Sequence, residues 1–141
     1  MTNKVPLTLN VKESLVKDFE RLLDKDSPLK GRENKHVFIL AMMTGFIADH
    51  RMKLDKKKSY IRLEYLTERE KSVIKAIALH DEKNLEILAD PQKMYSIAEE
   101  YASGGIKYLK DEVFSTHHGN YIKRLETKLV DEVKKALKKK M

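Results

Sequence analysis

The residue types that most often do chemistry in proteins are present in this chain, but their spacing does not build a reactive site. His117 and His118 are adjacent, so their rings point apart, and no third metal ligand stands at helical spacing from them. The acid pairs 99–100 and 111–112 are also adjacent, and neighbouring positions on a helix do not face each other. Phosphate-binding glycine loops and a GxSxG nucleophile turn are absent from the sequence. We therefore expect no catalytic residue, no metal and no cofactor, and we expect that the protein is not an enzyme.

Lysine offers a second kind of chemistry, the binding of polyanions. The 141 residues include 29 Lys and Arg against 22 Asp and Glu, which gives a formal net charge of +7. Such an excess favours encounters with nucleic acid, although lysine enrichment also occurs in proteins that bind no polyanion. Two lysine-rich stretches are the candidates for DNA contact: the connector KLDKKK and the end of the last expected helix. The alternative interpretation of the connector is a solvated loop. The predicted phosphate contacts there are Lys53, Lys56, Lys57, Lys58, Lys134, Lys135, Lys138 and Lys139.

Tyrosine is a third group with two open interpretations. The rings can stack on nucleic-acid bases, or they can fill the core and the interfaces of the fold, which suits most of their spacings better. The residues concerned are Tyr60, Tyr65, Tyr95, Tyr101, Tyr108 and Tyr121.

The first elements of the chain set up a specific DNA-binding hypothesis. Residues 5–11 (VPLTLNV) alternate as a half-buried strand does, although Pro6 demotes this segment to an edge strand or moves the strand start past itself. A helix over 12–25, a loop around Pro28 and Gly31 and an apolar helix over 34–52 follow. This order matches a ribbon–helix–helix unit, in which two chains pair their strands into a ribbon that enters the DNA major groove. In that interpretation the DNA contacts are Thr8 and Asn10, with Lys4 and Lys12 at the ends.

The alternative is that this strand pairs within its own chain. Residues 59–66 (SYIRLEYL) alternate in the same way and form a second strand candidate. Pairing it with 5–11 would satisfy one edge of both strands, so the sequence leaves the two interpretations open.

The stretch 34–52 (NKHVFILAMMTGFIADHRM) is apolar on nearly every face. A helix of that kind must be covered on most sides, either by the rest of the chain or by a partner chain. It is too short and too closely flanked by charge to span a membrane. We therefore expect it to be the centre of the core, and we expect self-association as a homodimer or a larger assembly.

The second half of the sequence predicts helices with clear start signals. Thr67 and Glu70 form a capping box, and Asp90 followed by Pro91 is a cap and first position for a helix that runs to about 103. Gly104 and Gly105 are expected to break or kink it. The last helix is expected over 121–140.

Together these elements predict a mainly α protein with one or two short strands, of the α+β class. We expect one domain over 1–141, with a strand–helix–helix part over 1–52 and a strand followed by helices over 59–141. The chain has no cysteine and no signal-like apolar N-terminus. We expect a cytoplasmic protein with no membrane partner.

Four segments in the middle of the chain carry a resemblance to a known family. They are SPLKGRENKHVFILAMMTGFIADHRMKL (27–54), IRLEYL (61–66), IALHDEKNLEILAD (77–90) and EEYASGGIKYLKDEV (99–113). Together they resemble the fourth family of small proteins associated with DNA phosphorothioation (Dnd) systems. The resemblance covers roughly 27–114 and leaves the last helix outside. Its most specific points are the paired glycines 104–105 and the segment 84–88.

The resemblance implies a non-catalytic accessory role in prokaryotic DNA modification or restriction defence. It brings no catalytic residues to this chain. The function expected first is DNA binding through the lysine-rich surface. The alternative is a helical adaptor that docks on itself or on a larger defence-system protein without contacting DNA, which the excess of apolar surface on 34–52 and on the last helix favours.

Overall fold

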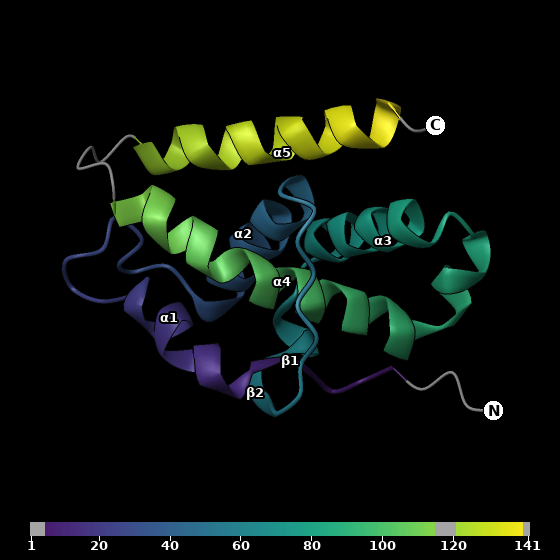
Figure 1. Cartoon of the computed structure of the whole chain (residues 1–141), viewed down its shortest axis with the longest axis horizontal. Coiled ribbons are helices and arrows are strands. Elements are labelled where there is room, and N and C mark those ends of the chain that lie inside the picture. Colours follow the sequence, from purple (N-terminus) through teal and green to yellow (C-terminus); the bar gives the residue numbers. More distant parts are fainter. Residues whose placement is uncertain (1–4, 115–120, 140–141) are drawn as a thin grey trace.

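Helices make up most of the chain, and one antiparallel sheet joins its two halves (Figure 1). The computed structural model describes residues 5–114 and 121–139, with side chains in the last helix described from 126 to 138. The elements in chain order are β1 (Thr8–Lys12), the 3-10 helix η1 (Glu13–Leu15), α1 (Val16–Arg21), α2 (Asn34–Ile47), β2 (Lys57–Arg62), η2 (Leu63–Tyr65), α3 (Glu68–Glu82), η3 (Leu85–Ala89), α4 (Pro91–Phe114) and α5 (Tyr121–Lys139). The predicted α+β class, with a strand first and helices after it, is confirmed.

The sheet is formed within the chain, because β1 pairs antiparallel with β2. β1 starts at Thr8, past Pro6, so the apolar alternation before it buries nothing: the side chain of Leu7 is 83% exposed. Along the other edge of β1, the Asn10 N–H donates to Glu99 Oε2 (2.7 Å) and the Lys12 N–H donates to Ser103 Oγ (3.1 Å). Both edges of this strand are thus occupied, and the ribbon between two chains that the ribbon–helix–helix interpretation requires has no free edge here.

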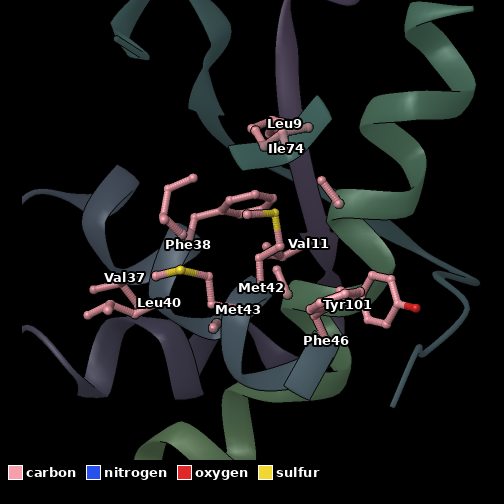
Figure 2. Close-up of a cluster of buried hydrophobic side chains, with 14 of the residues drawn as sticks. Leu9, Val11, Val37, Phe38, Leu40, Met42, Met43, Phe46, Ile74 and Tyr101 are labelled. Atoms are coloured by element: carbon pink, nitrogen blue, oxygen red, sulfur yellow. The ribbon is translucent and has the colours of Figure 1, made fainter. Parts of the chain in front are cut away.

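The apolar helix α2 is the centre of the core, as predicted, and its cover comes from the chain itself. Its side chains from Val37 to Met43 are buried, together with Phe46. Figure 2 shows them among Leu9 and Val11 of β1, Ile74 of α3 and Tyr101 of α4. The need for a partner chain to cover this helix therefore disappears.

The helix α2 ends at Ile47, five residues earlier than predicted. Asp49 has a left-handed backbone (φ 54°), and the His50 N–H donates to the Gly45 carbonyl (2.8 Å). That pattern is a Schellman cap, which satisfies the last carbonyls of a helix and turns the chain away. Glu33 is the cap residue at the other end of α2.

The paired glycines do not break a helix, and that prediction was wrong. Helix α4 runs without interruption from Pro91 to Phe114 and crosses α2 at these residues. A Cβ on Gly105 would lie 2.0 Å from the Ala41 carbonyl oxygen, and a Cβ on Gly45 would lie 2.1 Å from the Tyr101 carbonyl oxygen. The glycines are there because the two backbones approach closely, and helix propensity is the smaller effect.

The remaining start signals hold. The Glu70 N–H donates to Thr67 Oγ1 (3.1 Å), and the Thr67 N–H donates to Glu70 Oε1 (2.8 Å), which is the predicted capping box of α3. The Lys93 N–H donates to Asp90 Oδ1 (3.2 Å) at the start of α4. Helix α5 packs against α2, with Leu129 and Val133 buried. Among the described residues, no helix is both long and apolar enough to cross a lipid bilayer.

Candidate nucleic-acid interface

The β1–β2 pairing brings predicted DNA contacts from two distant segments together. Lys12 lies directly opposite Lys57, and Lys58 lies opposite Val11. Lys56 is held beside them, because the Glu13 N–H donates to its carbonyl oxygen (2.8 Å). Four lysines thus gather at one end of the β1–β2 ribbon, the name used here for the paired strands. Among the residues that the structure describes, none of the four makes an ion pair within 4.0 Å.

The outward face of the β1–β2 ribbon carries Lys12 and Lys57 and continues away from them with polar side chains, whereas Lys58, opposite the buried Val11, belongs to the other face. Residues directly opposite in an antiparallel pair share one face of the sheet. Asn10 faces Ser59 in the middle, and Thr8 faces Arg62 at the far end, where the exposed Arg62 guanidinium pairs with Glu64 (2.9 Å). Thr8 and Asn10 therefore lie on the outward face as predicted, but the partner strand is β2 of the same chain.

A buried carboxyl holds the edge of β1 that does not pair with β2. Glu99 is 5% exposed and accepts the Asn10 N–H, and burial raises the pKa of its carboxyl above the ordinary 4.5. The Asn10 hydrogen bond and the positive charge of Lys57 act in the opposite direction and are the smaller effects. Sequence reasoning missed Glu99 and Ser103 as supports of β1; their only signal is a spacing of four residues on one helix face.

Two further acids, Asp81 and Glu100, form structural contacts. Arg51 donates to Glu100 Oε1 (2.9 Å) and to Asp81, and the Tyr101 hydroxyl donates to the same Asp81. These bonds fasten the segment after α2 onto α3 and α4. No group of three potential metal ligands occurs among the described residues. The histidine pair 117–118 lies outside them.

A family model for DNA sulphur modification system-associated protein 4 matches residues 10–141. The chain belongs to that family. The match includes β2, the last three residues of β1 and the last helix, so the family extends beyond the 27–114 segment that carried the resemblance. None of the curated proteins and none of the solved structures matches the chain. This member of the family is therefore an accessory protein of a DNA sulphur modification system.

The predicted contacts on α5 of this family member lie apart from the ribbon. Lys134, Lys135 and Lys138 are exposed on α5, which Figure 1 shows along the top of the view, with the strands at the bottom. Lys139 ends that helix. Lys53 is exposed in the connection before β2, and Lys4 lies outside the described residues. The fold thus separates the predicted set into two basic regions on opposite sides of α2 and α4.

Proposed function

We propose that this accessory protein binds duplex DNA, with the lysine end of the β1–β2 ribbon on the phosphate backbone. The observation that carries the proposal is the direct opposition of Lys12 and Lys57 on the outward face, at the end of the ribbon where Lys56 and Lys58 also lie. Like charges opposite each other destabilise a strand pair. A phosphate between the ammonium groups removes that repulsion, and lysine is a common phosphate ligand.

The shape of the ribbon supports the same function. The major groove of B-DNA admits a two-stranded antiparallel ribbon. With the lysines on the backbone, the outward side chains of Thr8, Asn10 and Ser59 face the base edges. The family is associated with DNA modification, which favours DNA over other polyanions as the ligand.

The test is the salt dependence of duplex binding, measured by fluorescence anisotropy. Four neutralised phosphates predict a slope of log affinity against log salt of roughly −3 to −4, because each contact contributes about −0.9. The variant Lys12→Gln/Lys57→Gln/Lys58→Gln is expected to have a slope shallower by about 3 and an affinity about 100-fold weaker at 0.1 M salt.

The matched control removes the same number of charges from α5, in Lys134→Gln/Lys135→Gln/Lys138→Gln. If both triple variants lose affinity equally, net charge alone explains binding and the ribbon has no special role. Undetectable or salt-independent binding of the unaltered protein would contradict DNA binding altogether.

An adaptor role is the second candidate, in which the protein docks on a larger protein of the system. Two exposed leucines on η3 favour it: Leu85 is 71% exposed, and Leu88 is exposed beside it. They lie between α3 and α4, in a segment that also carried the family resemblance. Calorimetry with each purified protein of the system, using Leu85→Glu/Leu88→Glu as the variant, tests this role. Self-association also remains a prediction, which light scattering decides.

A further inference from the structure

The far end of the β1–β2 ribbon, away from its lysines, opens into a cleft of about 300 Å³. It lies between the ribbon, η2 and the start of α2. Side chains that can form hydrogen bonds and one exposed aromatic ring line it. Among them are Thr8, Glu33, Asn34, Lys35, Arg62 and Tyr65.

Tyr65 is the feature that the fold does not explain. Its side chain is 59% exposed, whereas Tyr95 and Tyr101 are buried in the core. The backbone beneath the ring is nevertheless fixed, because Lys35 Nζ donates to the Tyr65 carbonyl (2.9 Å) and pairs with Glu70 (3.2 Å). Glu70 belongs in turn to the capping box of α3. A free ring on a fixed backbone is a ready platform for stacking.

The chemistry of the lining selects between a phosphate and a base. Two cations line the cleft, but each already has a carboxylate partner: Lys35 pairs with Glu70 (3.2 Å) and Arg62 pairs with Glu64 (2.9 Å). The carboxylate of Glu33, which also lines the cleft, repels phosphate. Carboxylates and amides are instead the groups that bind the amino and ring nitrogens of bases. Stacking on an aromatic ring contributes further affinity for any base.

We infer that this cleft takes an unstacked DNA base, which lies on the Tyr65 ring with its edge toward Glu33 and Asn34. The inference rests on the proposed binding of DNA by the ribbon. Four residues separate Lys12 from Thr8 along β1, which is roughly 13 Å at the rise of a strand. The duplex advances 3.4 Å per base step. The ribbon therefore holds the backbone about four steps from the base that enters the cleft.

The experiment compares two labelled duplexes of the same sequence, one fully paired and one with a single unpaired nucleotide. The unaltered protein is expected to bind the unpaired duplex about tenfold more tightly, which corresponds to one stacked base. Tyr65→Ala abolishes that preference, whereas Tyr65→Phe keeps it, because the ring is retained. Tyr108→Ala, which removes a ring that is 51% exposed on α4, is the matched control and also keeps the preference.

The outcomes separate this inference from the proposed function. Equal affinity of the unaltered protein for both duplexes, or a preference that survives Tyr65→Ala, overturns the base site. If binding still depends on Lys12 and Lys57 in that case, the ribbon proposal stands alone. If neither duplex binds, both proposals fall together. Thermal melting of each tyrosine variant confirms that the fold is intact.

Discussion

The two lysine-rich regions differ in what their charges do for the fold. On α5, Asp131 stands three and four residues before Lys134 and Lys135, the spacing at which opposite charges support a helix. These lysines also lie near the C-terminal end of α5, where cations interact favourably with the helix dipole. At the ribbon, Lys12 faces Lys57 directly, and their repulsion opposes the pairing of the strands.

This difference between the two regions indicates which of them binds a ligand. A charge that stabilises its own element has a sufficient explanation in folding. At the ribbon, Lys57 interacts with Glu99, but that carboxyl is buried and its pKa is raised by burial, so an exposed counter-charge for these lysines has to come from outside. This need distinguishes the ribbon from α5, although both regions look equally basic in the sequence.

The largest expected effect tests the support under the ribbon. Gly105→Ala gains up to about 1 kcal/mol of helix propensity. Its Cβ would lie 2.0 Å from the Ala41 carbonyl oxygen, however, and 2.4 Å from the Gly45 nitrogen, so backbone must move. We expect a net loss of about 2 kcal/mol or more in the free energy of unfolding, measured by urea denaturation.

The exposed Lys107→Ala on the same helix is the control for Gly105→Ala, with a change within about 0.5 kcal/mol. A Gly105→Ala protein as stable as the original would contradict the close crossing of α2 and α4. The positions of Glu99 and Ser103, which hold β1, would then also be in doubt.

The second effect separates binding from stability at the ribbon itself. Lys12→Glu replaces a like-charge pair with an opposite-charge pair across the strands, so stability is expected to stay level or rise by about 0.2–1 kcal/mol. Duplex affinity is expected to fall at least about tenfold, because one phosphate contact becomes a repulsion. Thermal melting and anisotropy on the same preparation measure both. A parallel fall in stability and affinity would mean that the variant disrupts the ribbon.

The third effect is the converse on α5. Lys134→Gln/Lys135→Gln/Lys138→Gln is expected to lower the free energy of unfolding by about 0.5–1 kcal/mol, as helix pairs and the dipole interaction are lost. Duplex affinity should change by less than about threefold. A large loss of affinity with unchanged stability would reverse the roles of the two regions.

The smallest effect concerns Glu99. Burial raises the pKa of the Glu99 carboxyl in the folded state. Just above pH 4.5 the folded protein therefore keeps a proton on this carboxyl, whereas the unfolded chain has released it. Stability from this group therefore falls as pH rises through that range. Gln at this position does not titrate and can still accept the Asn10 N–H. The stability of Glu99→Gln relative to the original should increase from pH 4 toward pH 7, and parallel profiles would contradict a perturbed carboxyl.

Much of the fold was accessible from the sequence, because its local signals are strong. The capping box at Thr67, the Asp90–Pro91 start and the apolar run of α2 each follow from residue types within one turn. The interpretation of Gly104 and Gly105 failed because glycine has two uses, breaking a helix and admitting another backbone, and only the position of α2 decides between them.

The lysines of the candidate site could be named from the sequence, but their positions relative to one another could not be predicted. Lys12 and Lys57 come together through the register of β1 and β2, which residues 45 positions apart do not reveal. Val5 and Leu7 continue the strand alternation in sequence, yet the core does not reach them. Periodicity specifies which faces are apolar, and only the packed structure specifies how far each face is covered.

The assignment of the ribbon as the DNA-binding surface is tested most directly by an experiment that measures the lysines of both basic regions together. Lysines are acetylated under limiting conditions with and without duplex DNA, and the modification of each is measured by mass spectrometry. We predict that DNA protects Lys12, Lys56, Lys57 and Lys58, while Lys134, Lys135 and Lys138 react as before. Protection confined to α5, or no protection while DNA is demonstrably bound, would contradict the assignment of the ribbon as the DNA-binding surface.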